Sequence, residues 1–145
     1  MRIENEDEDE LRGIYAETQT IAEVGASGDP SKPGNRIPRY LQSQGYRIVP
    51  VSPKAGEILG EVTVPSLADV DVPIDVVDVF RPPEEAEGVA RAAIAAGAKV
   101  LWFQLGTYTE EAATLAREAG LTVVYGRCMG ATHGQLGLGP GPDSA

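Results

Sequence analysis

Cysteine and histidine are nearly absent from this sequence, which limits the chemistry that it can support. Among 145 residues there is one cysteine, Cys128, and one histidine, His133. A single cysteine excludes an internal disulfide and is compatible with a reducing compartment. Two candidate ligands fall short of the four that a structural zinc ion requires, and two such residues five positions apart do not establish a nucleophile–base dyad. We therefore predict no metal site and no catalytic residues.

Long apolar runs and a basic N-terminal segment are absent as well. No stretch approaches the ~20 apolar residues that a membrane span requires. The N-terminus is acidic, whereas a signal peptide begins with basic residues. We expect a cytoplasmic protein without a membrane partner.

Positive charge is scarce and unevenly placed. The chain has 12 basic and 22 acidic residues, a net charge of −10, and half of this excess lies in residues 1–19. This balance disfavours binding to nucleic acid, which depends on neutralising phosphates. The few basic residues of the body are therefore informative, and four of them lie close together: Lys32, Arg36, Arg39 and Lys54. The expected partner is a small-molecule ligand. The sequence is also compatible with a protein partner, which it does not identify.

The hydrophobic pattern predicts strands that alternate with helices. Strands are predicted over residues 20–24, 46–51, 74–80, 98–103 and 121–125, and helices over residues 9–18, 35–45, 84–96 and 109–120, with one helical turn at 66–69. This alternation predicts a single α/β domain, a Rossmann-like doubly wound parallel sheet with helices on both faces. We assign residues 1–10 to a frayed acidic leader, 11–136 to the domain and 137–145 to a flexible Gly/Pro tail.

Residues 20–53 have the layout of a phosphate-binding βαβ unit. A strand leads into small residues, then basic residues, then a helix for which we predict Asn35 as the N-cap. Small residues let the backbone approach a pyrophosphate, and the N–H groups and dipole of a helix start attract an anion. The predicted ligand contacts in this unit are Gly25, Ala26, Ser27, Lys32, Asn35 and Arg36.

Two features of a common dinucleotide site are missing from this unit. There is no complete G-x-G-x-x-G, and the second strand ends in Val51-Ser52-Pro53. An acidic residue at that strand end would hold the ribose 2′-hydroxyl of NAD. The loop indicates a phosphate-bearing nucleotide, while the strand end argues against ordinary NAD.

Taken together, these segments resemble the CoA-binding domain family, small stand-alone proteins that share a fold with the nucleotide-binding domain of succinyl-CoA synthetase α-subunits. The resemblance spans roughly residues 11–136 and is carried by VGAS at 24–27, the Asn35-Arg36 helix start, VSPK at 51–54, EILGEVTVPSLADV at 57–70, IDVVDVFRPP at 74–83, WFQLG at 102–106, and Arg127-Cys128 followed by His133. It implies a Rossmann-like fold that holds CoA without catalytic residues of its own. Glu23 departs from the family, which usually has an apolar residue there, and residues 129–132 are atypical.

The remaining candidate contacts lie at other strand ends, where parallel sheets bind their ligands. Lys54 is suited to a phosphate and Gln104 to the pantetheine amides. The alternative for Lys54, as for Lys32 and Arg36, is a solvated surface charge. Phe80 and Arg81 fit stacking on adenine or lining the pantetheine arm, or simply a rigid exit from the strand. Ser52 and Pro53 are compatible with the phosphorylated ribose of CoA or NADP, and equally with no nucleotide.

The leading hypothesis is a protein that binds coenzyme A or an acyl-CoA without catalysis. The alternatives are an NAD(P)-binding enzyme or redox-sensing module, and a regulatory module whose site is vestigial. Glu23 fits three interpretations: a buried carboxylate with a shifted pKa, a neighbour of the ligand, or a solvent-facing residue at an edge.

Overall fold

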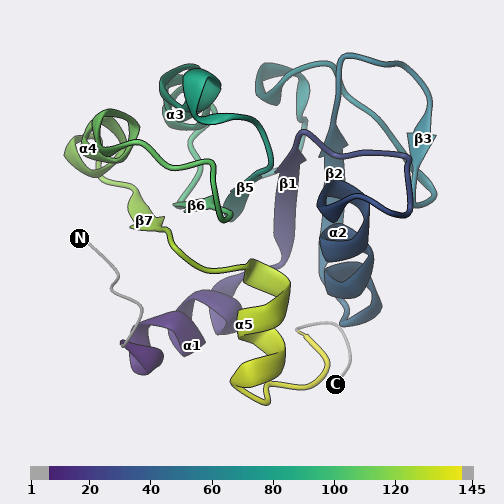
Figure 1. Cartoon of the computed structure of the whole chain (residues 1–145), viewed down its shortest axis with the longest axis horizontal. Coiled ribbons are helices and arrows are strands. Elements are labelled where there is room, and N and C mark those ends of the chain that lie inside the picture. Colours follow the sequence, from purple (N-terminus) through teal and green to yellow (C-terminus); the bar gives the residue numbers. More distant parts are fainter. Residues whose placement is uncertain (1–6, 142–145) are drawn as a thin grey trace.

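Five parallel strands form the centre of the computed structural model, which describes residues 7–141 (Figure 1). Their order across the sheet is β2-β1-β5-β6-β7. The strands are β1 (Thr20–Val24), β2 (Arg47–Val51), β5 (Val76–Val79), β6 (Val100–Phe103) and β7 (Thr122–Val124). Every neighbouring pair is parallel. The predicted Rossmann-like doubly wound α/β fold is confirmed.

Helices cover both faces of the sheet because alternate residues of each strand point to opposite sides. On one face lie α1 (Glu8–Glu17), α2 (Pro33–Ser43) and α5 (Met129–Gln135), and on the other α3 (Ala86–Ala95) and α4 (Glu110–Glu118), as Figure 1 shows. Ile21, Val76 and Trp102 pack beneath the first group. Their strand neighbours Ala22 and Val77 pack beneath the second. The core is therefore divided into two layers by the sheet.

A small hairpin lies beside the edge strand β2 (Figure 1). Its strands β3 (Glu57–Ile58) and β4 (Glu61–Val62) are antiparallel. Leu59 and Gly60 connect them with positive φ angles of 56° and 80°, the backbone of a two-residue hairpin turn. Two backbone bonds link the segment that follows to β2, from Val64 N–H to the Pro50 carbonyl and from Ser52 N–H to the Val64 carbonyl. Residues 67–69 form the predicted helical turn as the 3-10 helix η1 (Leu67–Asp69).

Two helix starts differ from the sequence-based expectation. The first helix begins at Glu8, where Asp7 accepts a hydrogen bond from the Glu10 N–H, so residues 8–10 belong to α1 rather than to a frayed leader. Residues 1–6 of that leader lie outside the described residues. The second helix begins at Pro33 with Lys32 as the N-cap residue. The prediction of Asn35 as N-cap was wrong, because the fixed φ of proline suits the first helical position.

The third predicted helix is divided into a 3-10 turn, η2 (Pro83–Glu85), and α3. The last helix, α5, was not predicted, because Met129–Gln135 contains two glycines and no apolar stripe. Tertiary contacts hold it in place: the Tyr15 hydroxyl donates to the Met129 carbonyl at 2.6 Å, and Tyr40 Oη lies 2.8 Å from His133 Nδ1. Within residues 7–141, no helix combines the length and apolar character needed to cross a bilayer.

Candidate functional site

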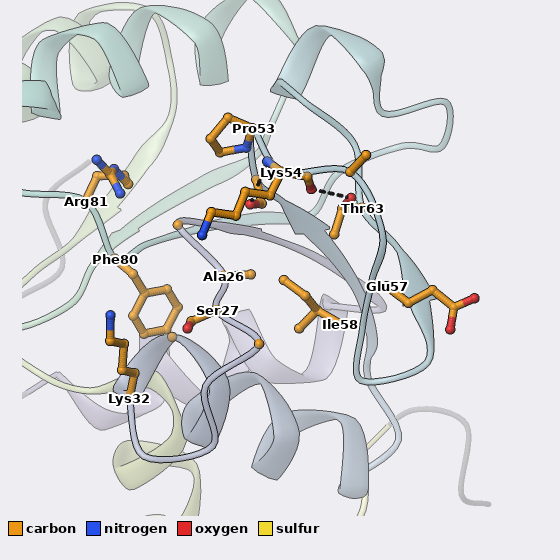
Figure 2. Close-up of a pocket in the computed structure, with 15 residues that line it drawn as sticks. Ala26, Ser27, Lys32, Pro53, Lys54, Glu57, Ile58, Thr63, Phe80 and Arg81 are labelled. Atoms are coloured by element: carbon orange, nitrogen blue, oxygen red, sulfur yellow. Dashed lines mark hydrogen bonds between the residues drawn. The ribbon is translucent and has the colours of Figure 1, made fainter.

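The candidate site is a cleft of about 510 Å³ at the carboxyl ends of β1, β2 and β5 (Figure 2). Strand order reverses between β1 and β5, because the chain proceeds from β1 to β2 in one direction and from β5 to β7 in the other. Ligands of such sheets bind at this switch point. The cleft is lined by Gly25, Ala26, Ser27, Gly28, Lys32, Gly34, Ser52, Pro53, Lys54, Ala55, Glu57, Ile58, Thr63, Phe80 and Arg81.

Two glycines allow the loop after β1 to pack closely against its neighbours. Gly25 has a φ of 90°, and a Cβ atom there would lie 2.8 Å from Arg81 Cδ. A Cβ atom on Gly34 would lie 2.7 Å from the Gly25 carbonyl oxygen. Ser27 N–H donates to the Gly34 carbonyl at 3.1 Å. The first turn of α2 therefore lies directly against the floor of the cleft.

The start of α2 presents a favourable environment for an anion. The side chain of Lys32, the N-cap residue, makes no capping hydrogen bond, and Pro33 has no N–H group. The Gly34 N–H has no acceptor among the described residues, and Asn35 and Arg36 both bond to the Lys32 carbonyl at 2.9 Å. A helix of 11 residues brings the positive end of its dipole to this point.

Three cationic side chains, each from a different segment, lie along one side of the cleft. Figure 2 shows Lys32 at the start of α2, Lys54 after β2 and Arg81 after β5. Arg81 is bound by Glu85, 2.7 Å from its Nη2, which lowers the pKa of Glu85 and raises that of Arg81. Within residues 7–141, neither lysine forms a salt bridge. A chain with a net charge of −10 thus has a locally basic cleft.

The opposite side of the cleft is formed by the hairpin and the segment that leads into it. Thr63 Oγ1 donates to the Lys54 carbonyl at 2.9 Å, and Ser52 Oγ accepts from the Lys54 N–H at 3.3 Å. Ile58 is buried, while Glu57 is exposed and points away from the lysines in Figure 2. Sequence reasoning missed Ile58 and Thr63 as lining residues, because Leu59-Gly60 is not one of the dipeptides that signal a two-residue hairpin turn.

Most of the predicted contact residues line the cleft, but three do not. Asn35 is buried, and its Nδ2 donates to the Ser27 carbonyl at 2.8 Å, so that it holds the loop in place. Arg36 is exposed on α2 outside the lining. Gln104 is buried and donates from Nε2 to Asp78 Oδ1. None of these three residues lies in the cleft wall: Asn35 and Gln104 make internal hydrogen bonds, and Arg36 lies on the surface.

Cys128 and His133 are not among the residues that line the cleft; they belong to the N-cap and the body of α5. Cys128 Sγ accepts from the Ala131 N–H at 3.4 Å as the N-cap of α5. His133 is buried beside Tyr40, and burial lowers its pKa. Across the described part of the chain, no group of three or more His, Cys, Asp or Glu residues is arranged to hold a metal ion. The contacts of Cys128 and His133 stabilise the packing of α5.

Known proteins are similar to this chain in sequence and in fold. A Bacillus subtilis protein described as uncharacterized, YneT, is 37% identical over 131 residues, covering 90% of this chain and 97% of the relative. The structure of a hypothetical protein from Pyrococcus horikoshii is 40% identical with a TM-score of 0.89, covering 94% of this chain and 96% of that one. A dinucleotide-forming acetyl-coenzyme A synthetase from Ca. Korarchaeum cryptofilum is 30% identical with a TM-score of 0.70, covering 81% of this chain but 27% of the enzyme.

The family model described as a CoA binding domain matches residues 19–134, from the start of β1 into α5. This range includes all the strands of the sheet and every residue that lines the cleft. The chain belongs to the CoA-binding domain family.

Proposed function

We propose that this chain binds coenzyme A or an acyl-CoA in the cleft and has no catalytic activity of its own. The observation that carries the proposal is the basic cleft at the switch point of the sheet, in a chain of the CoA-binding domain family. A pyrophosphate and a ribose 3′-phosphate give CoA several negative charges. The start of α2 and the three cations around the cleft complement these charges.

The second strand end supports CoA over ordinary NAD. Ser52 is buried at the end of β2, and its hydroxyl is hydrogen-bonded to the Lys54 backbone N–H. A carboxylate there would bind an unmodified ribose and repel a phosphorylated one. Ser52 adds no negative charge, and Lys54 adds a positive one two residues later. This arrangement favours a phosphorylated ribose.

Isothermal titration with CoA, NAD⁺ and NADP⁺ tests the proposal. We expect CoA to bind more tightly than either dinucleotide, and the double variant Lys32→Ala/Lys54→Ala to lose at least tenfold in CoA affinity. Arg47→Ala is the matched control, because Arg47 is an exposed cation at the amino end of β2, opposite the cleft. NAD⁺ binding as tight as CoA binding would favour the alternative of a dinucleotide-dependent enzyme or redox sensor.

The absence of catalysis is tested separately. After incubation with acetyl-CoA we expect unchanged thioester and no acyl adduct on the protein by mass spectrometry. The lone thiol, Cys128, caps α5 and has no general base hydrogen-bonded to it among the described residues. An acetyl group on Cys128 that disappears in Cys128→Ser would show covalent chemistry and overturn this part of the proposal.

A further inference from the structure

Two carboxyl groups lie side by side in the interior of the sheet, directly beneath the cleft. Glu23 in β1 is the register partner of Asp78 in β5, and the strands are parallel neighbours. Both side chains are fully buried, with 0% exposure. Glu23 is two residues before Gly25, and Asp78 is two residues before Phe80, so the pair lies just below two segments of the cleft wall.

The hydrogen bonds of this pair are incomplete unless a proton is added. Asp78 Oδ1 accepts from Gln104 Nε2. Glu23 Oε1, Glu23 Oε2 and Asp78 Oδ2 have no donor among the described residues. Carboxylate oxygens only accept hydrogen bonds, whereas a protonated carboxyl group donates one. A single proton on one Glu23 oxygen supplies a donor for Asp78 Oδ2, and without it two buried like charges face each other.

The groups around the pair do not supply a substitute for this proton. Cys128 interacts electrostatically with Glu23, and Tyr15 with Asp78; burial raises the pKa of the Tyr15 hydroxyl. The positive charge of Arg127 interacts with Tyr15 and opposes the rise in its pKa. Arg127 Nη1 lies 3.5 Å from Thr132 Oγ1. His133 on α5 is buried beside Tyr40.

From α2, which packs over the same face, the side chains of Arg36 and Arg39 are exposed, and its buried residues are Gly34, Asn35, Pro38 and Leu41, none of which ionises. On the neighbouring strand β6, Trp102 is the register partner of Asp78 and is uncharged.

We propose that Glu23 and Asp78 share one proton at neutral pH, and that this hydrogen bond holds the ends of β1 and β5 together beneath the cleft. Glu23 is the donor and Asp78 the acceptor, because Asp78 is already stabilised as an anion by Gln104. The proton makes the stability of the cleft floor depend on pH.

The direction of this dependence follows from the two carboxyl groups. Burial and the neighbouring Asp78 raise the pKa of Glu23 well above its usual value of 4.5, and burial raises the pKa of Asp78 to about 6. The folded state therefore keeps a proton that the unfolded chain releases above the usual pKa. The stability that this proton provides is complete at lower pH and is lost as pH rises toward the folded-state pKa of Glu23.

Glu23→Gln tests the proposal, because glutamine donates the same hydrogen bond and does not titrate. Urea unfolding of both proteins without ligand is measured from pH 5 to pH 9. We expect the variant to gain stability relative to the parent as pH rises, by up to about tenfold in the unfolding equilibrium constant per pH unit. Glu118→Gln, on the exposed surface of α4, is the control and should show no such trend. Parallel curves for Glu23→Gln and the parent would overturn the proposal.

Infrared spectroscopy of the unmodified protein keeps the test independent of how the variant folds. At pH 7 the parent should show the carbonyl band of a buried protonated carboxyl group, which persists when exposed carboxyls are ionised. Absence of this band would mean that both groups are ionised and would refute the shared proton. Where Glu23→Gln folds, the band should disappear.

A last measurement concerns the cleft and rests on the proposed function. CoA affinity should fall more steeply toward alkaline pH in the parent than in Glu23→Gln, since loss of the proton separates the strand ends that carry the cleft wall. Equal pH profiles would overturn the link between the pair and the cleft. Absence of CoA binding at any pH would instead refute the proposed function, while the unfolding and infrared results would still decide whether the proton is shared.

Discussion

At the scale of single residues, the position of a cation matters more than its presence in the sequence. Lys32 and Arg36 are four residues apart and both belong to the start of α2, yet Lys32 lines the cleft and Arg36 does not. One helical turn separates them along the helix axis. Their expected contributions to ligand binding therefore differ, although the sequence alone made them equivalent.

We predict that Lys32→Ala weakens CoA binding by about 1–3 kcal/mol, the range for a hydrogen bond to a charged group. Arg36→Ala should cost less than half as much, because its side chain is exposed outside the lining. Titration at low and high salt measures both, and the loss for Lys32→Ala should shrink at high salt because charge attraction is screened. Equal losses for the two variants would place the phosphates on the exposed side of α2.

At the scale of elements, the contact between the loop after β1 and the first turn of α2 determines the shape of the cleft floor. Gly28 and Gly34 both line the cleft, but they differ in their surroundings. A Cβ atom on Gly34 meets the Gly25 carbonyl oxygen at 2.7 Å, whereas a Cβ atom on Gly28 meets nothing within 4 Å. The two positions make a matched pair within one loop–helix unit.

We predict that Gly34→Ala destabilises the fold by about 1–3 kcal/mol, the typical cost of inserting a methyl group into a closely packed position, and weakens CoA binding. The obstacle is backbone rather than the end of a flexible side chain, so α2 itself must shift. Gly28→Ala should remain within about 0.5 kcal/mol of the parent, as surface substitutions generally do. Urea unfolding compares the variants, and similar midpoints would mean that α2 moves freely against the loop.

The N-terminal helix contributes to the core through two residues of one face. Leu11 is fully buried and Tyr15 is 2% exposed, with its ring against Trp102 and His133. These contacts link α1 to the sheet and to α5.

We predict that Leu11→Ala lowers the free energy of unfolding by about 2–5 kcal/mol, the range for emptying a buried leucine site. Glu17→Ala, on the exposed side of the same helix, is the control and should have little effect. Thermal or urea unfolding measures the difference. A midpoint for Leu11→Ala close to that of the parent would show that α1 is not coupled to the folding of the domain.

At the scale of the whole molecule, the cleft is built from segments that meet only in the folded state. Lys32, Lys54 and Arg81 follow three different strands, and their convergence requires the sheet to be formed. A ligand that contacts all three segments therefore binds the folded chain and has no equivalent site in the unfolded one.

We predict that CoA raises the thermal midpoint of the protein, since a ligand at a hundred times its dissociation constant stabilises the folded state by about 2.7 kcal/mol. For a chain of this size the shift should be several degrees and should grow with the logarithm of the CoA concentration. NAD⁺ at the same concentrations is the comparison and should shift the midpoint less. An unchanged midpoint in saturating CoA would argue against binding to the folded domain.

Local pattern predicted most of the architecture because strands and helices each carry their own periodicity. The five strands, the order of alternation and the strand–loop–helix layout around Gly25 follow from residues that are near one another in the chain. The local sequence pattern did not predict an element whose stability comes from contacts with distant segments. The glycine-containing α5 depends on bonds from Tyr15 and Tyr40, which are distant in sequence.

The sequence by itself thus determined the α/β alternation and the identity of most cleft residues, because these depend on local propensity and on which residues follow each strand. The tertiary structure decided which of them share one surface: it placed Lys32, Lys54 and Arg81 around one cleft and left Arg36 outside the lining. It also paired Glu23 with Asp78, 55 positions apart in the chain. Strand order and register arise from packing between distant segments, and no local pattern encodes them.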